Sequence, residues 1–206
     1  MNVIVNADDL GMSMAVNDAI FAAFDAGLLK SASILVHGPA FADAVARLRD
    51  RPGLALGLHL DSTEFAPSTG PLYERWRRQH DRALDAGLTL DHYDSHQHIH
   101  LRWASLPALR RLCAETGVGR VRGRSLAYGQ ALRSRLWRAT VRNFAAIPDH
   151  YYAMSRYVER CAPAHAGWTE IMVHPGNPHH ARYADEMQAL ALLSPQWTLG
   201  RFADLG

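Results

Sequence analysis

The sequence predicts an α/β fold, a short or distorted TIM-like βα barrel with mainly parallel strands. Short apolar runs alternate with helical stretches along the 206 residues, which is the pattern of repeated βα units. Six or seven strand-like runs occur, fewer than the eight of a complete barrel of about 250 residues. An open doubly wound sheet is the alternative, but neither a GxGxxG nor a Walker A sequence follows the first run.

The first βα unit carries the clearest local signals. Residues 2–7 (NVIVNA) form an apolar run typical of a buried strand, and residues 8–11 (DDLG) contain turn-forming residues that would end it. Ser13 is a suitable N-cap for the helix that follows, and Gly27 is a suitable stop. We therefore expect Asp8 and Asp9 to lie in a turn at the end of the first strand.

The same alternation continues to the end of the chain. Further strands are predicted where aliphatic residues cluster, and helices where apolar residues recur on one face. The predicted strands are 33–37, 54–60, 92–98, 120–122 and 170–173, and the predicted helices are 41–48, 72–84, 105–115, 134–144 and 181–193. Residues 61–70 are expected to form a loop, and residues 148–164 show no clear pattern.

Composition predicts a single cytoplasmic domain over residues 1–206. The chain has 22 Lys and Arg against 20 Asp and Glu and is 48% hydrophobic, which excludes collagen-like, coiled-coil and disordered chains. No apolar run approaches the ~18–20 residues of a membrane span, and the first residues lack the basic region of a signal peptide. Cys113 and Cys161 lack ligand-type spacing, so we expect them to be small buried apolar groups.

Acidic and imidazole side chains gather at the ends of the predicted strands. Asp8 and Asp9 follow the first strand, His59 ends the third, and His174 follows the strand 170–173. The fourth strand runs into the sequence DSHQHIH, residues 94–100. Because ligands bind at the carboxyl ends of parallel strands, these side chains are expected to converge on one rim.

Each candidate also has a purely structural interpretation. Asp8 and Asp9 can be turn and capping residues, and His59 can be a hydrogen-bonded core histidine. His174, followed by Pro175 and Gly176, can form a hydrogen bond within that turn. The run 94–100 is harder to explain structurally, since a period of two places its acidic and imidazole residues on one face. These residues are Asp94, His96, His98 and His100.

One metal ion cannot use all four residues of that face, because same-face neighbours on a strand lie ~6.6 Å apart. One or two would be ligands, and the others would support them or contact substrate. An aspartate with two histidines suits a catalytic divalent ion that polarises a carbonyl and activates water. A second carboxylate would then act as base and a separate histidine as acid.

Four sequence blocks, in this order, resemble the YdjC-like carbohydrate deacetylases. They are VNADDLGMSMAVNDAI, GLHL, HYDSHQHIHL and IMVHPG, and they extend from Asn6 to Gly176. The resemblance implies a distorted βα barrel related to the polysaccharide deacetylases and removal of an acetyl group from N-acetylated sugars. It also implies one divalent ion (Mg²⁺ or Zn²⁺, with Co²⁺ or Mn²⁺ as alternatives) on Asp9, His59 and His96. Asp8 matches the proposed base and His174 the proposed acid.

Two features bear on the substrate. Only 34 residues separate His59 from Asp94, a shorter segment than in the family, which predicts a more open site for a larger or lipid-linked glycan. The stretch 102–142 holds ten arginines and one acid, Glu115. These arginines, among them Arg122 and Arg124, either contact a phosphate-bearing carrier or form the solvated face of two helices.

Other functions remain as alternatives at this stage. A metallo-phosphoesterase uses similar Asp and His sites in a basic setting, although two-metal sites need more carboxylates. A glycan-binding protein with a degenerate site would not need all five residues that the resemblance assigns to the metal ion or to catalysis. Nucleic-acid binding is not expected, because few aromatic residues are interleaved with the arginines. The predicted partner is therefore an N-acetylated sugar or glycan, free or linked to lipid or phosphate, and either a monomer or a homodimer fits the sequence.

Overall fold

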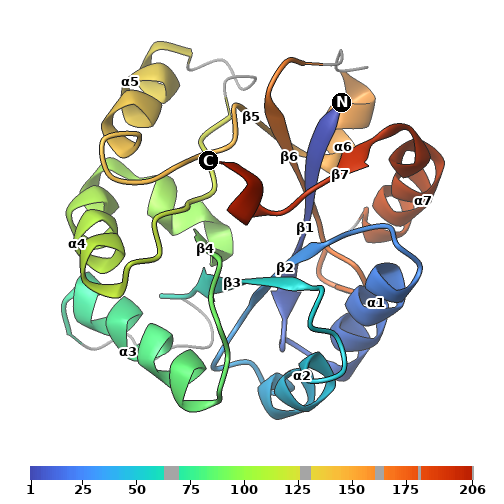
Figure 1. Cartoon of the computed structure of the whole chain (residues 1–206), viewed down its shortest axis with the longest axis horizontal. Coiled ribbons are helices and arrows are strands. Elements are labelled where there is room, and N and C mark those ends of the chain that lie inside the picture. The colour runs from blue at the N-terminus through green and yellow to red at the C-terminus, as the bar shows by residue number, and fades with distance from the viewer. Residues whose placement is uncertain (63–69, 126–130, 161–164, 181, 206) are drawn as a thin grey trace.

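The strands of the protein lie inside a ring of helices (Figure 1). The computed structural model describes residues 1–62, 70–125, 131–160, 165–180 and 182–205. The strands are β1 (Asn2–Leu10), β2 (Ser31–Ile34), β3 (Ala55–Leu60), β4 (His92–Ser95), β5 (His150–Ala153), β6 (Trp168–Val173) and β7 (Thr198–Leu199). The α-helices are α1 (Met14–Asp25), α2 (Phe41–Leu48), α3 (Leu72–Asp85), α4 (Leu106–Thr116), α5 (Ala131–Val141), α6 (Met154–Glu159) and α7 (Tyr183–Leu193).

All the strands belong to one parallel sheet in the order β4-β3-β2-β1-β6-β5, with β7 paired to the start of β1. Two single bridges, Tyr93 with Val121 and Arg120 with Ala146, continue the sheet beyond β4. Within the described residues no pairing joins that segment to β5, so the barrel is incomplete. The fold is thus the distorted TIM-like barrel that the sequence predicts.

Several predicted elements are confirmed. The α1 helix starts after Ser13, whose Oγ accepts a hydrogen bond from the Val16 amide at 3.2 Å, and α2 has the predicted bounds. The segment 148–164, which showed no pattern, contains β5 and α6. Residues 120–122 form only the two single bridges instead of a strand, and β2 begins and ends earlier than expected.

The turn expected at residues 8–11 begins later than predicted. β1 continues through both aspartates to Leu10, and its register with β2 shifts between Ala7 and Leu10. Within this irregularity Asp9 has a φ of 70°, a left-handed conformation that is uncommon outside glycine. The irregularity turns the side chains of two sequence neighbours toward the same end of the barrel, whereas a regular strand would point them to opposite faces.

The strand predicted at 92–98 is also shorter than expected. β4 ends at Ser95, and the chain enters the 3₁₀ helix η1 (His96–Leu101), in which Gln97 and His98 have φ values of 53° and 54°. The period-two pattern expected for residues 94–100 therefore stops at Ser95. As a result, His96, His98 and His100 do not share one face.

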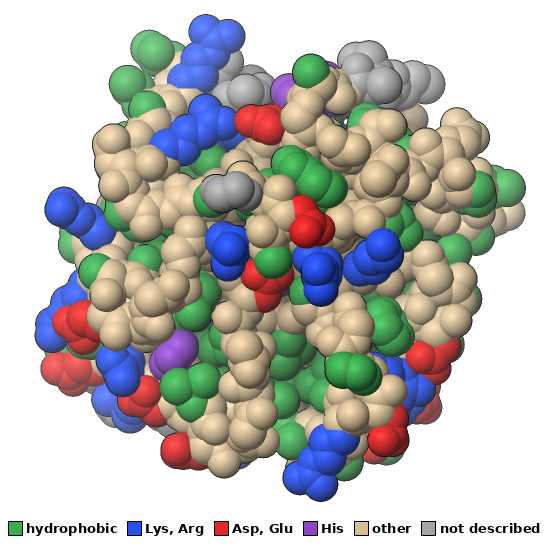
Figure 2. Space-filling model, viewed as in Figure 1, with side chains coloured by type: hydrophobic (Ala, Val, Ile, Leu, Met, Phe, Trp, Pro, Cys, Tyr) green, Lys and Arg blue, Asp and Glu red, His purple; other side chains and the backbone are tan. Residues whose placement is uncertain are grey.

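The end of the barrel where the strands start is closed by the C-terminal segment. β7 and the 3₁₀ helix η4 (Phe202–Leu205) cross this end, and the Phe202 ring stacks on His92 with centroids 3.7 Å apart. Gly57 of β3 makes room for the His92 ring, since a Cβ at this position would lie 2.3 Å from His92 atoms. Both termini lie at this end in Figure 1, and Figure 2 shows positive and negative side chains interspersed over the same face.

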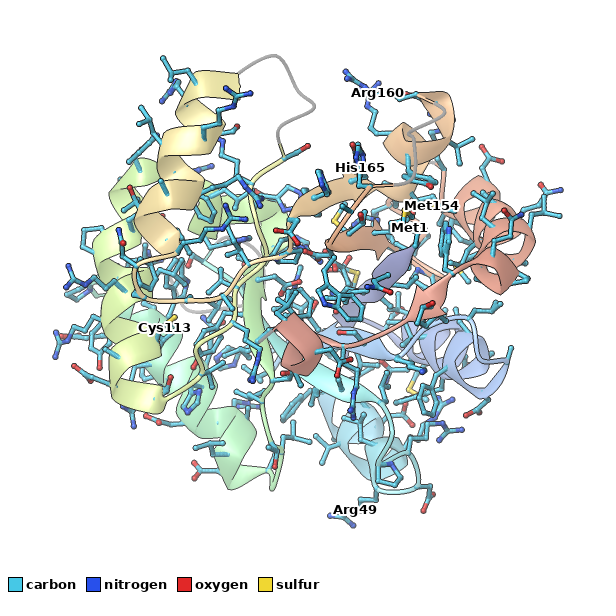
Figure 3. All side chains as sticks on the ribbon, turned by 45° about the horizontal axis from the view of Figure 1, so that its top comes forward. Met1, Arg49, Cys113, Met154, Arg160 and His165 are labelled. Atoms are coloured by element: carbon cyan, nitrogen blue, oxygen red, sulfur yellow. The ribbon has the colours of Figure 1, made fainter. Side chains whose placement is uncertain are left out.

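Two further sequence expectations can be checked against the structure. Cys113 on α4 (Figure 3) is buried, and burial raises the pKa of its thiol to about 12, as expected for a small apolar group. Cys161 lies outside the described residues. Among the helices of the described residues, none combines the length and the apolar character needed to span a bilayer.

Candidate functional site

Asp9, His59 and His96 meet at the carboxyl end of the barrel. The end of β1 supplies Asp9, the end of β3 supplies His59, and the first residue after β4 is His96. The Asp9 Oδ1 atom lies 3.3 Å from His59 Nε2 and 3.2 Å from His96 Nδ1. Asn177 donates a hydrogen bond to the other Asp9 oxygen at 2.8 Å. The register and the β1 irregularity thus bring three separate sequence motifs into contact.

The charges of this triad suit a cation. Burial favours the neutral acid, but hydrogen bonds from His59 and His96 outweigh it and lower the pKa of Asp9. One ligand atom from each residue lies within 4.8 Å of the other two. An aspartate oxygen with two imidazole nitrogens is a donor set that suits Zn²⁺ and similar transition-metal ions, whereas Mg²⁺ prefers oxygen ligands. The residues present therefore fit a single divalent ion.

Asp8 lies beside this triad and is held by Arg122. The guanidinium reaches both carboxylate oxygens of Asp8, at 2.7 Å and 2.6 Å, and Asn6 donates to Asp8 Oδ1 at 2.9 Å. Burial would raise the pKa of Asp8, but the charge of Arg122 prevails and lowers it. Asp8 is consequently an ionised carboxylate in a fixed orientation.

Arg122 belongs to a buried ionic network inside the barrel. Its guanidinium is fully buried and also lies 2.9 Å from Asp94 and 2.6 Å from Glu170 of β6. The expected contact between Arg122 and a phosphate-bearing carrier is therefore wrong, because this side chain is sealed among carboxylates. Burial, only partly offset by Arg122, raises the pKa of Glu170 to about 8.

Asp94 positions the His59 ring. Asp94 Oδ1 lies 2.9 Å from His59 Nδ1, and Ser33 of β2 donates to Asp94 Oδ2 at 2.8 Å. This contact leaves the other ring nitrogen of His59 directed at Asp9, an arrangement that commonly orients imidazole ligands of metals. Asp94, His59 and Asp8 also lie close together, but the positive charge of Arg122 occupies the space beside both carboxylates.

His174 faces the same cleft from the end of β6. Its Nδ1 lies 3.5 Å from a carboxylate oxygen of Glu186, whose other oxygen lies 3.0 Å from His180. Burial would lower the pKa of His174, but Glu186 together with Asp8 and Asp9 raises it. The turn that follows packs tightly on α1, because Gly176 has a φ of 68° and a Cβ there would meet Ala15 O at 2.5 Å. His174 is thus held in place and favours the protonated form.

These five residues line one cleft of about 560 Å³. Asp8, Asp9, His59, His96 and His174 all contribute to its walls, as the strand-end rule predicts. The other two histidines of the 94–100 run lie differently. His100 is fully buried, with its Nδ1 2.6 Å from Ser95 Oγ, whereas His98 lies at the edge of the cleft, 3.3 Å from Tyr151 Oη.

Sequence reasoning missed Glu170, Glu186 and Asn177. For Glu170 the sequence analysis predicts only a place in a strand, although a charged residue in the apolar run EIMV is itself a signal of a buried polar network. Glu186 and Asn177 occur in a polar context that gives no such signal. Their roles depend on how α7 and the loop after β6 pack against the site.

The arginines of the stretch 102–142 lie in different surroundings. Arg122 is in the barrel interior, and Arg138 is buried with its guanidinium donating to the Pro148 and Asp149 carbonyls at 2.6 Å and 2.8 Å. Exposed arginines of α4 and α5 form a solvated face, as one alternative predicted. Arg102, Arg124 and the exposed Arg133 of α5 are among the residues that line a second cavity.

Known sequences resemble this chain over most of its length. Residues 2–199 match a family model described as YdjC-like protein. A carbohydrate deacetylase from Brevibacillus brevis is 33% identical over 85% of this chain and 81% of its own length. A carbohydrate deacetylase from Vibrio parahaemolyticus is 31% identical over 57% of each chain.

A solved structure shares the fold. The crystal structure of a candidate cellobiose-phosphate cleavage protein from Enterococcus faecalis superposes with a TM-score of 0.79 at 19% sequence identity. The superposition covers 100% of this chain and 98% of the other. At this level of identity the likeness establishes the architecture, the incomplete parallel barrel, and no more than that.

Proposed function

Because the chain belongs to the YdjC-like protein family, we propose that it removes the acetyl group from an N-acetylated sugar in a reaction that depends on a divalent metal ion. The names of the two carbohydrate deacetylase relatives support the reaction class. The observation that carries the proposal is the convergence of a metal-type triad, an ionised carboxylate and a histidine on one cleft. Metal-assisted hydrolysis of an amide uses these functions together.

Asp9, His59 and His96 are the residues that would hold the ion. When bound, a divalent ion supplies Lewis acidity, which polarises the acetyl carbonyl and makes water more acidic. The three residues line the cleft together with Asp8 and His174. The buried Asp94 and Ser33 fix the His59 ring, so the site is preorganised by hydrogen bonds beneath it.

Asp8 is the proposed general base and His174 the proposed general acid. Arg122 keeps Asp8 ionised and oriented, so that its carboxylate takes a proton from the attacking water. The pKa of His174 is raised, so its ring can carry a proton. The protonated ring donates this proton to the departing amine nitrogen, which is a poor leaving group without it. The C–N bond breaks, the acetyl group leaves as acetate, and the sugar retains a free amine.

Acetate release tests this proposal. The purified protein is incubated with a panel of N-acetylated sugars and oligosaccharides after chelation and after addition of Mg²⁺, Zn²⁺, Mn²⁺ or Co²⁺. We expect acetate and a new primary amine in equal amounts, and only with metal. Metal-independent release, or release of phosphate from phosphorylated sugars without acetate, would contradict the proposal.

A further inference from the structure

A second cluster of metal-type side chains lies beside the triad described above. It consists of His174 after β6, His180 in the turn segment that follows, and Glu186 in the first turn of α7. One ligand atom from each residue lies within 4.8 Å of the other two. Both histidines line the cleft, so an ion from solvent can reach them. The cluster shares no residue with the Asp9 triad.

The turn after β6 sets the spacing of the two imidazole rings. The Asn177 amide donates to the His174 carbonyl at 3.3 Å, and the His180 amide donates to the Asn177 carbonyl at 3.1 Å. These hydrogen bonds fold the chain back on itself, and the rings of His174 and His180 stack with centroids 4.1 Å apart. The backbone of the turn therefore holds both rings on the same side of the cleft.

Glu186 joins the two rings through separate oxygens. Its Oε1 lies 3.0 Å from His180 Nε2, and its Oε2 lies 3.5 Å from His174 Nδ1. The same Oε2 accepts a hydrogen bond from the His174 amide at 3.2 Å, which fixes the carboxylate. Burial would raise the pKa of Glu186, but its contacts with His174 and His180 prevail and lower it. Glu186 is thus a buried negative charge that faces two imidazole nitrogens.

The Nδ1 atom of His174 has the surroundings of an unused metal ligand. It is buried and makes no hydrogen bond within the described residues, because Glu186 stands 3.5 Å away, beyond a good hydrogen bond. Two ligands about 2.1 Å from a tetrahedral ion lie about 3.4 Å apart. The separation of these two atoms therefore matches two ligands of one ion better than it matches a hydrogen bond.

We propose that His174, His180 and Glu186 form a second, weaker zinc site, and that zinc bound there inhibits the enzyme. Two imidazoles with one carboxylate are a zinc donor set that leaves a further coordination position open to water, whereas Mg²⁺ prefers oxygen ligands. The inhibition rests on the proposed function, in which His174 is the general acid. The metal site itself stands on the geometry of the cluster.

Coordination removes the acid from the reaction. Zn²⁺ binds the lone pair of His174 Nδ1, so the proton that this nitrogen carries in the imidazolium is released to solvent. The ring then keeps a proton only on Nε2, as a neutral imidazole, which gives it up far less readily than an imidazolium. The departing amine is left without a proton donor, and the C–N bond of the substrate stays intact.

Two features make this site weaker than the Asp9 triad. Zinc must displace a proton from His174, whose pKa is raised. In addition, the His180 side chain is 30% exposed, whereas that of His59, oriented by Asp94, is only 2% exposed. We therefore expect dialysis against metal-free buffer to empty the second site and leave the first one filled. Titration at equilibrium is needed to detect it.

Calorimetric titration with Zn²⁺ alone counts the sites without substrate. The full chain is loaded with one equivalent of Zn²⁺, dialysed, and titrated with further Zn²⁺. The test variants are His180→Asn, which removes a partly exposed ligand, and Glu186→Gln, which removes the charge and keeps the shape. The matched control is His179→Asn, which changes the neighbouring exposed histidine of the same cleft.

The wild type and His179→Asn are expected to take up a second zinc ion. His180→Asn and Glu186→Gln should bind it at least about tenfold more weakly, because one of three ligands is lost or uncharged. All four proteins should keep the first ion after dialysis. No uptake by the wild type beyond the dialysed content, or equal uptake by His179→Asn and His180→Asn, would overturn the second site.

Acetate release measured over the same range of free zinc tests the inhibition. In the wild type, activity should fall as the second ion binds, with half-inhibition at the zinc concentration that half-fills the site. His180→Asn should need at least about tenfold more zinc for the same inhibition. A second ion that binds without slowing acetate release would overturn the inhibitory role. If no acetate is released at any zinc concentration while the binding pattern holds, the deacetylase proposal fails and the zinc site stands.

Discussion

His92 begins β4 and His96 directly follows its end, and the two side chains have different surroundings. His92 begins the strand, is fully buried, and stacks on Phe202 under the C-terminal segment. Neither of its ring nitrogens has a hydrogen-bond partner among the described residues, and burial lowers its pKa to about 3. His96 directly follows the strand and lies 3.2 Å from Asp9 in an accessible cleft.

The comparison shows that position along the strand, and not residue type, decides what a histidine does here. At the closed end an imidazole is a neutral packing ring against Gly57 and Phe202. At the carboxyl end the strands diverge into loops, so side chains from β1, β3 and β6 can approach one another around a cavity. The predictions below test whether function is confined to that end.

The largest expected effect is at the aspartate pair. Asp8→Asn should keep the metal while lowering the turnover of N-deacetylation by roughly 10²–10⁴-fold, the usual contribution of a positioned base. Asp9→Asn should lose the metal as well as the activity, because it removes the carboxylate that meets both histidines. Metal analysis and acetate release distinguish the two. If the phenotypes are exchanged, the two aspartates have been assigned the wrong roles.

His174 should show a selective effect. His174→Ala is expected to lower N-deacetylation by at least about 10²-fold, since an amine leaving group needs a proton from the acid. Hydrolysis of an activated acetyl ester, whose leaving group needs no proton, should fall much less, and metal content should not change. Equal losses on amide and ester would make His174 a positioning residue, and His98 at the edge of the cleft would be the next candidate.

His92 at the closed end should affect stability alone. His92→Phe keeps a ring against Phe202 and should retain metal and activity. The folded protein holds His92 neutral with a pKa of about 3, whereas the unfolded chain takes up a proton near pH 6.5. The stability that depends on neutral His92 is therefore present above pH 6.5 and is lost as pH falls toward 3.

Denaturant unfolding at several pH values measures this effect. Between pH 7 and pH 5 the wild type should lose about 2 kcal/mol more stability than His92→Phe, from one proton bound only by the unfolded chain. Parallel pH dependence in the two proteins would show that His92 is not buried in its neutral form. Loss of metal in this variant would show that the closed end also shapes the site.

Much of the architecture can be predicted from the sequence because the signals are local. The Ser13 cap, the apolar face of α2 and the aliphatic β3 each depend on neighbouring residues. The carboxyl-end rule for parallel strands then places Asp8, Asp9, His59, His96 and His174 on one rim without any knowledge of the sheet order. Their contacts with one another extend over the whole chain and appear only in the structure.

The expectations that the structure corrects depended on long-range packing. Residues 94–100 alternate as a strand would, yet Gln97 and His98 adopt left-handed conformations as the chain turns into η1. Arg122 resembles its neighbours in an arginine-rich stretch, and only the fold places it between Asp8, Asp94 and Glu170. No local pattern distinguishes a buried guanidinium from an exposed one when its partners lie 48 and 114 residues away.

Metal content of the purified chain tests the central claim most directly. Wild type, His92→Phe and His59→Ala/His96→Ala are loaded with one divalent metal, dialysed and analysed for bound ion per chain. We predict one ion in the wild type and in His92→Phe, and none in the double variant, with all three folded by circular dichroism. A double variant that retains a full equivalent of metal would contradict the assignment of Asp9, His59 and His96 as the metal site.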